Sequence, residues 1–189
     1  PYGEGACQAL GTALAMAEGY GFSICNYDNY VGTVDWGGEE SQLDILANLD
    51  VVPSGEGWTV TAPFEPVEKD GRLYGRGTAD DKGPAVSALY ALRAVKELGI
   101  PLKKRVRLIL GTDEECGSSD IKHYYAVEKE APMTFSPDGA FPVVNIEKGH
   151  LEGELEAEFE ASQELPRVKS IKAGTKINVV PGKAFAVFE

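Results

Sequence analysis

The sequence lacks the segments that mark a membrane or exported protein. No apolar run approaches the roughly 18 residues that a membrane-spanning helix needs, and no basic stretch followed by an apolar one opens the chain. Cysteine is scarce: Cys7, Cys25 and Cys116 are an odd number at no short pairing spacing, which is typical of a reducing compartment rather than of a disulfide-stabilised fold. We therefore expect a cytoplasmic protein without transmembrane helices.

Basic residues are also scarce. Lys and Arg number 18 against 30 Asp and Glu, so the formal net charge is −12. Because nucleic acids and anionic lipid surfaces carry the same sign of charge, we expect neither as a partner. Such an acidic balance usually reflects a solvated surface. The alternative is that some carboxylates converge on bound cations, and only local motifs can decide between the two.

What is present suits a globular protein. The 189 residues are 43% hydrophobic and 25% charged, enough for one full domain and the start of another. The chain opens at Pro1 rather than at a methionine, and it closes at Glu189 directly after a β-like apolar run. We therefore expect an internal piece of a longer protein.

Up to about residue 149 the hydrophobic pattern alternates between helix and strand periods. The predicted helices are 4–18, 84–98 and 119–130, the last preceded by a serine that can cap it, and the predicted strands are 22–25, 31–36, 43–52 and 105–110. Residues 43–52 are nearly all apolar, as in a strand buried on both faces. Between them, residues 54–71 are rich in Gly, Pro and charge, which predicts a long loop with a hairpin.

The pattern changes near Lys148–His150. Over residues 151–161, five glutamates alternate with Leu, Gly, Ala and Phe, which predicts a half-exposed antiparallel strand. The expected fold class is therefore α/β: a mixed, largely parallel sheet flanked by helices over residues 1–149, followed over 150–189 by the beginning of a β-rich domain.

Acidic residues stand at four places that are ends of predicted strands or the loops that follow them. They are Asp50, Asp80 with Asp81, Glu114 with Glu115, and Asp138. Ligands of open α/β sheets gather at the carboxyl ends of strands, and carboxylates brought together repel one another unless cations neutralise them. A single carboxylate of this kind is more often a cap or a turn residue. Four at corresponding positions favour a pair of divalent metal ions.

Four ordered motifs carry a family resemblance: LDILANLDVVPSGEGW, LYGRGTADDKGP, LILGTDEECGSSD and SPDGAFPVVNIEKG, joined by TKINVVPGKAFAVF near the C-terminus. They resemble the zinc-dependent dipeptidase, aminoacylase and carnosinase family of metallopeptidases, and most of all its bacterial Xaa-His-type dipeptidases. The resemblance implies a zinc-exopeptidase-like catalytic domain with an inserted lid domain. It further implies two zinc ions as cofactors, for which Mn²⁺ or Co²⁺ can substitute, and a dipeptide or small peptide as substrate.

The resemblance also implies roles for single residues. Asp80 matches the carboxylate that bridges both metal ions, and Glu115 and Asp138 match ligands of one ion each. Glu114 matches the general base that takes a proton from the attacking water. Asp50 matches the acid that orients the first histidine ligand, a supporting role that fixes the ring.

Two further expectations come from the same source. The peptide bond after the bridging carboxylate is cis in relatives, so a cis bond is expected between Asp80 and Asp81. Asn178 matches a position in the second domain that contacts substrate.

One ligand position departs from the family pattern. The family has His-x-Asp after the buried strand, whereas this chain has Asn48, Leu49 and Asp50. Asn48 therefore stands where a zinc-binding histidine is expected, and its neutral amide oxygen suits Ca²⁺ or Mg²⁺ better than zinc. The second family histidine lies beyond the end of this sequence, and the motifs assign no ligand role to His123 or His150.

Three hypotheses follow for function. The first is a metallopeptidase that hydrolyses dipeptides with a zinc-bound water and Glu114 as base. The second, favoured by Asn48, is a catalytically inactive fragment or descendant that binds a peptide or a divalent cation. The third is an amidohydrolase acting on N-acyl amino acids. The sequence does not specify an oligomeric state.

Overall fold

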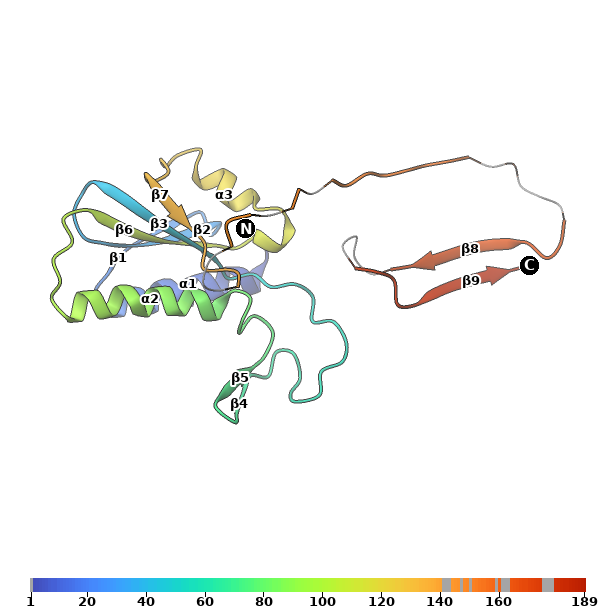
Figure 1. The fold of residues 1–189 in the computed structure, drawn as a ribbon, viewed down its shortest axis with the longest axis horizontal. Coiled ribbons are helices and arrows are strands. Elements are labelled where there is room, and N and C mark those ends of the chain that lie inside the picture. Colours follow the sequence, from blue (N-terminus) through green and yellow to red (C-terminus); the bar gives the residue numbers. More distant parts are fainter. Residues whose placement is uncertain are drawn as a thin grey trace. The chain divides into compact units, whose positions relative to one another are not determined.

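The computed structural model describes residues 2–140, 144–146, 148–149, 151–158, 160, 164–174 and 179–189. Two compact units make up the chain, Pro1–Asn145 and Ile146–Glu189 (Figure 1). The assignment of residues 1–149 to a catalytic domain and of 150–189 to the start of a lid domain stays a prediction. None of the helices in the described ranges has the length and apolar character needed to cross a bilayer.

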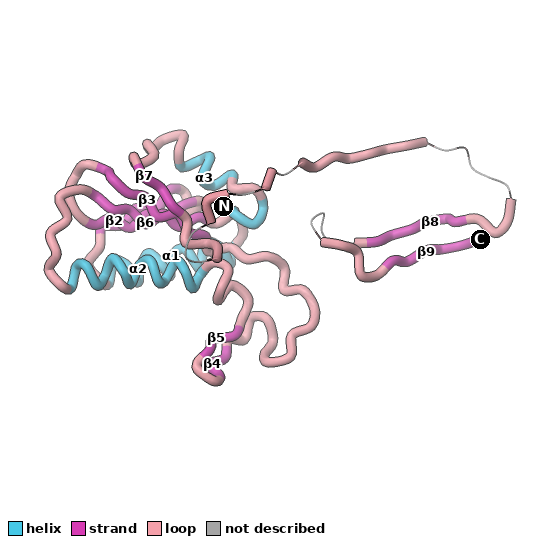
Figure 2. Tube along the Cα trace, viewed as in Figure 1, coloured by secondary structure: helices cyan, strands magenta, loops and turns pink. Residues whose placement is uncertain are grey.

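A mixed sheet forms the centre of the first unit (Figures 1 and 2). Within the described residues its five strands, in spatial order, are β1 (Ser23–Tyr27), β2 (Val31–Trp36), β6 (Arg105–Gly111), β3 (Ser41–Asn48) and β7 (Met133–Phe135). Strand β2 pairs antiparallel with β1 and β6, whereas β3 runs parallel to both β6 and β7. The carboxyl ends of β3, β6 and β7 therefore meet at the same edge of the sheet.

Helices cover both faces of this sheet. Figure 1 shows α1 (Glu4–Gly19) and α2 (Lys82–Glu97) on one side and α3 (Ser119–Tyr124) on the other. Because side chains alternate along a strand, Leu108 and Leu110 of β6 pack on the side of α1 and α2, while Ile109 packs with Tyr124 of α3. The predicted fold class of a mixed sheet flanked by helices is confirmed.

The two long helices each present one apolar stripe to the sheet. The buried members of the stripes are Leu10, Leu14 and Ala17 in α1 and Ala85, Ala88, Leu89 and Leu92 in α2. Residues three and four positions apart lie on the same side of a helix, which is why this spacing predicted both elements. Burying each large apolar side chain stabilises the unit by about 1.5–3 kcal/mol.

The third helix is shorter than the predicted span 119–130. It ends at Tyr124, whose side chain is fully buried against the sheet, and turns follow it. The backbone N–H of Ala131 then donates to the buried carboxylate of Asp44 in β3 at 3.0 Å. A helix continued to residue 130 would carry the chain away from this bond and from β7, a short strand that the sequence pattern did not reveal.

The long loop before α2 contains the predicted hairpin, formed by β4 (Val67–Lys69) and β5 (Arg72–Tyr74). The second unit contains a hairpin of β8 (Val168–Ala173) and β9 (Ala184–Phe188). The predicted strand over 151–161 is wrong for the residues described there, 151–158 and 160, which belong to no strand. Strands β8 and β9 pair with each other and not with this segment, and Leu155 is 99% exposed.

Candidate metal centre

The loops that follow β3 and β6 meet although they are far apart in sequence. Asn48, the last residue of β3, is aligned with Gly111, the last residue of β6. The backbone N–H of Leu49 donates to the carbonyl oxygen of Gly111 at 2.9 Å, so the pairing continues past the end of β3. Of the acidic residues predicted from the sequence, Asp50 stands just beyond the end of β3, and Glu114 and Glu115 just beyond the end of β6.

Asp50 fixes the segment that carries the paired glutamates. Its two carboxylate oxygens accept hydrogen bonds from the backbone N–H groups of Glu114, at 3.3 Å, and Glu115, at 3.0 Å. These residues begin a short 3₁₀ helix, η1 (Glu114–Cys116), whose first N–H groups have no partner inside the helix. Asp50 also accepts a bond of 3.3 Å from the side-chain amide of Asn48. Both of its oxygens are thus engaged in holding other groups.

Asp80 and Asp81 are joined by the expected cis peptide bond, immediately before α2 begins at Lys82. The Asp81 side chain is fully buried and accepts a hydrogen bond of 3.2 Å from the backbone N–H of Asn48. Its other oxygen, Oδ1, is buried and has no hydrogen-bond partner among the described residues. Burial raises the pKa of Asp81 to about 7, and the carboxylates of Asp138, Asp80 and Glu114 raise it as well.

The other acidic residues also act on one another. Burial raises the pKa of Glu114 above its usual value, and Glu115, Asp138, Asp50 and Asp80 raise it further. Burial and the Asp80 carboxylate raise the pKa of Asp138. The structure therefore brings the six sequence-predicted acids near enough to one another to raise the pKa values of three of them, because like charges repel. The cation of Lys82 interacts with Asp50 and Asp80, although burial lowers its pKa.

A buried aspartate that the sequence analysis missed shapes the loop after β6. Asp120 is fully buried and accepts hydrogen bonds from the backbone N–H groups of Thr112, Asp113 and Ile121, at 2.5, 3.1 and 2.7 Å. Ser118, the serine expected to cap α3, makes no capping bond: its backbone is left-handed (φ 54°), and the N–H of Ile121, which a cap could accept, donates to Asp120. These three hydrogen bonds to the Asp120 carboxylate fix the course of the backbone from β6 to α3. They therefore also fix the position of η1, which lies between the two.

Comparison with known proteins assigns a family to this arrangement. Residues 45–179 match Peptidase family M20/M25/M40. The chain belongs to this family. It is 41% identical over 191 residues to the putative dipeptidase YtjP of Bacillus subtilis, covering the whole of this chain and 41% of that protein. It is 38% identical over 182 residues to the Beta-Ala-Xaa dipeptidase of Lactobacillus delbrueckii subsp. lactis, covering 96% of this chain and 38% of that protein.

Solved structures of M20 peptidases share the fold. Human carnosine dipeptidase 1 superposes with a TM-score of 0.62 at 23% identity, over 72% of this chain and 33% of the human chain. An M20 family metallo-carboxypeptidase from Sulfolobus solfataricus gives a TM-score of 0.61 at 23% identity, over 73% and 33%. The M20 chain described here spans about two fifths of the length of the curated relatives it matches.

The M20 family implies a divalent metal, and the acidic residues fit one by charge. Burial and then the repulsion of neighbouring carboxylates raise the pKa values of Glu114 and Asp138, and a divalent cation would relieve the repulsion. The fit to zinc is poorer, since the side chain at the end of β3 is an amide, Asn48, rather than an imidazole. Within the described ranges, no group of three or more His, Cys, Asp or Glu side chains is arranged to hold a metal ion. A cation would have to draw its ligands closer together.

The remaining predicted residues lie elsewhere. His123 stacks on Tyr30 with ring centres 4.7 Å apart and lies 3.3 Å from a carboxylate oxygen of Asp28, contacts that belong to the side of the sheet covered by α3. Asn178 and His150 lie outside the described residues.

Proposed function

We propose that this chain supplies part of the active centre of a metal-dependent dipeptidase, with Asp80, Glu115 and Asp138 as metal ligands and Glu114 as general base. The observation that carries the proposal is the convergence of these carboxylates at the edge where β3, β6 and β7 end. Membership of the M20 family and the dipeptidase names of its relatives support the same reaction. As the chain spans about two fifths of those relatives, the activity is proposed for the whole protein.

The residues of this chain would act in the following way. Glu114, whose pKa is raised by burial and by the neighbouring carboxylates, accepts a proton from the attacking water and returns it to the leaving amine. Asp50 holds the backbone of Glu114 and Glu115 in place by accepting hydrogen bonds from their N–H groups. A bound pair of divalent ions supplies charge stabilisation for the developing oxyanion and a more acidic water. Because the Lactobacillus relative is named a Beta-Ala-Xaa dipeptidase, β-alanyl dipeptides are the first substrates to test.

Two variants test the proposal. The whole protein that contains this chain is prepared unaltered, with Asp80→Asn and with Glu114→Gln, incubated with Zn²⁺ or Mn²⁺, freed of excess ion and analysed for bound metal. Each form is then assayed for release of β-alanine from a β-alanyl dipeptide. Glu18→Gln, an exposed substitution on α1, is the control. Asp80→Asn should lose bound metal, whereas Glu114→Gln should keep the metal and lose about 100-fold or more of the hydrolysis. An unaltered protein that retains no metal would contradict the proposal.

A second candidate is a protein that binds a peptide or a hard cation without cleaving anything. Asn48 favours it, because an amide oxygen supports Mg²⁺ or Ca²⁺ rather than zinc chemistry. In that case the chain binds a cation, but Glu114→Gln and the unaltered protein are equally inactive on the dipeptide.

A further inference from the structure

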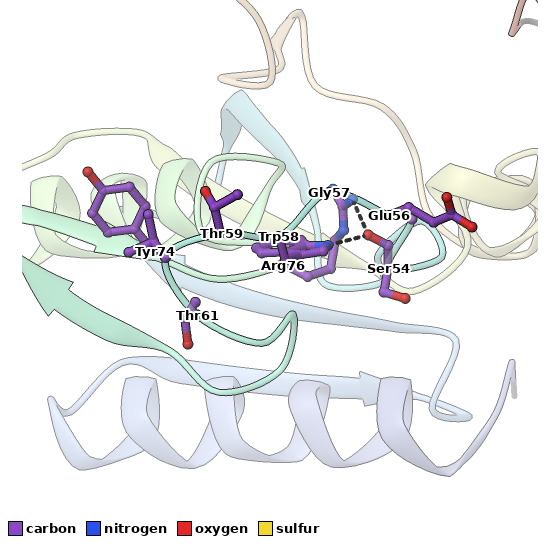
Figure 3. A pocket seen from close by; sticks show the side chains of 10 residues that line it. Ser54, Glu56, Gly57, Trp58, Thr59, Thr61, Tyr74 and Arg76 are labelled. Atoms are coloured by element: carbon purple, nitrogen blue, oxygen red, sulfur yellow. Dashed lines mark hydrogen bonds between the residues drawn. The ribbon is translucent and has the colours of Figure 1, made fainter. Parts of the chain in front are cut away.

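A pocket in the long loop before α2 contains the cation of Arg76, which forms no ion pair with a carboxylate of the described residues. It has a volume of about 420 Å³ and is lined by residues 54–61 together with Tyr74 and Arg76 (Figure 3). One wall begins at Ser54, four residues after Asp50 in the sequence, and the other ends at Arg76, four residues before Asp80. The two segments that form this pocket therefore continue directly into the acidic loops of the candidate metal centre, although the pocket residues have no part in the role proposed for that centre.

Arg76 is held in place against an aromatic ring. Its backbone N–H donates to the carbonyl oxygen of Pro63 at 2.7 Å, and its Nη2 donates to the carbonyl oxygen of Ser54 at 3.1 Å. The indole Nε1 of Trp58 donates to the same Ser54 oxygen at 2.7 Å, and the guanidinium carbon lies 5.4 Å from the centre of the Trp58 ring (Figure 3). The position of the guanidinium is thus fixed before any ligand arrives.

Most of the hydrogen-bonding capacity of this guanidinium remains unused. An arginine side chain has five N–H donors, and in the described part of the chain only one, on Nη2 of Arg76, has an acceptor. The Nε atom is buried without a hydrogen-bond partner there. Glu56 is the acidic side chain in the lining, and Figure 3 shows it pointing away from Arg76 and Trp58. A fixed cation with unused donors in a pocket is suited to an anionic ligand.

We propose that this pocket binds the free carboxylate of a peptide or an amino acid, with Arg76 as the anchor and the Trp58 ring as the surface on which the ligand packs. The choice of a peptide rests on the proposed dipeptidase function. The planar fork of a guanidinium matches the two oxygens of a carboxylate, and the aromatic face beside it offers apolar contact to the adjoining side chain. Inorganic phosphate shares the anionic chemistry and is distinguished by the test.

Trp58 provides a direct readout, because the chain has only two tryptophans. The other, Trp36, packs edge-on against Phe22 in the core, and a Trp36→Phe variant leaves Trp58 as the single indole. This variant is freed of metal on a chelating resin and titrated with β-alanyl-alanine, with the C-terminal amide of the same dipeptide, and with inorganic phosphate. Trp58 fluorescence should change saturably with the acid, and the amide should bind at least about tenfold more weakly.

Substitutions in this background identify the anchor. Arg76→Gln should abolish the fluorescence response to the dipeptide acid. Arg72→Gln, on the exposed strand β5 of the neighbouring hairpin and outside the pocket lining, should leave the response unchanged.

Three results would overturn the proposal: equal binding of the acid and the amide, an unchanged response in Arg76→Gln, or binding of phosphate alone. If circular dichroism shows that Arg76→Gln does not fold, the comparison of acid and amide on the Trp36→Phe chain decides alone. The titration is made without metal, so a failure of the dipeptidase hypothesis appears in the metal and hydrolysis assays and leaves this result independent.

Discussion

Asn48 is the residue on which the choice of cation would depend in the proposed metal centre. Its backbone N–H donates to buried Asp81, and its side-chain amide donates to Asp50. An imidazole at this position could make the same bond to Asp50 through one ring N–H and present its other nitrogen to a metal ion, the arrangement by which carboxylates orient histidine ligands. The surroundings of Asn48 therefore already contain the partner that a histidine ligand would need.

Replacing Asn48 by histidine should raise zinc affinity by about tenfold or more, while Mg²⁺ affinity stays level or falls, because imidazole suits zinc and adds no oxygen donor. Competition with a fluorescent zinc chelator measures the zinc affinity, and competition with a fluorescent Mg²⁺ indicator measures the Mg²⁺ affinity. Asn26→His, in the exposed edge strand β1, is the matched control and should leave zinc affinity unchanged. Equal zinc affinity in Asn48→His and in the unaltered chain would count against a metal site at the end of β3 and in favour of the non-catalytic hypothesis.

At the scale of elements, the start of α2 depends on one glycine. A Cβ atom on Gly83, in the first turn of α2, would lie 2.1 Å from the carbonyl oxygen of Thr78. The Thr78 carbonyl is a backbone group, so it cannot move aside as a flexible side chain can. The loop that carries Asp80 and Asp81 therefore packs against the first turn of α2 only because position 83 has no side chain. Placement of these acids is therefore tied to the packing of the helix that follows them.

Gly83→Ala should lower the free energy of unfolding by about 1–3 kcal/mol, the usual cost of forcing extra atoms into a packed site. It should also reduce metal retention, because the loop of residues 78–81 must move. Gly11→Ala is the control in α1, where no atom lies within 4 Å of the added Cβ, and it should stabilise the protein by about 0.5–1 kcal/mol. Urea denaturation measures both changes. Stabilisation by both substitutions would show that the loop does not pack on α2 as described.

The elements that the sequence predicted well are those with a clear period. Helices α1 and α2 carry apolar stripes at helical spacing, and β3 and β6 are apolar runs, so these elements could be located in advance, although the predicted strand 43–52 continues four residues beyond the end of β3 at Asn48. Strand β7 has three residues, too few to show a period. The segment 151–161 has a clear strand period, but a strand also requires a neighbour with which to pair, and the pattern carries no information about that.

The contacts that fix the candidate site were beyond sequence reasoning for a similar reason. Asp81 bonds to Asn48, which is 33 residues away, and Asp50 bonds to Glu115, which is 65 residues away. A periodic pattern identifies the face of an element, whereas these bonds depend on the register between strands. The Asp80–Asp81 cis bond could be anticipated only from family resemblance, since nothing in the local composition of the chain marks it.

At the scale of the whole first unit, the two faces of the sheet are stabilised by different interactions. The side covered by α1 and α2 is an apolar core, whereas the side covered by α3 contains a buried charge network. Arg107 of β6 makes two bonds to Asp35, at 2.6 and 2.7 Å, and further bonds to the hydroxyl of Tyr124, at 2.7 Å, and to Glu128, at 3.2 Å. One guanidinium thus links β2, β6, α3 and the turn after α3.

Arg107→Met should therefore destabilise the protein by about 3–5 kcal/mol, since it leaves the carboxylates of Asp35 and Glu128 without their cation in a partly buried place. Against a typical total stability of about 5–15 kcal/mol, this loss should bring the urea midpoint down sharply. Lys104→Met is the control, because it breaks an ion pair of 2.8 Å with Glu40 that is exposed at both ends and should cost about 0–1 kcal/mol.

Equal small losses in the two variants would mean that α3 is held on the sheet by Tyr124 and its aromatic neighbours alone. The segment η1, which carries Glu114, lies in the chain between β6 and α3. Equal small losses would therefore indicate that the Arg107 network does not help to hold this segment. A large loss in Arg107→Met alone would instead tie the two together: the position of Glu114 would depend on a charge network on one face of the sheet as well as on Asp50 and Asp120 at its edge.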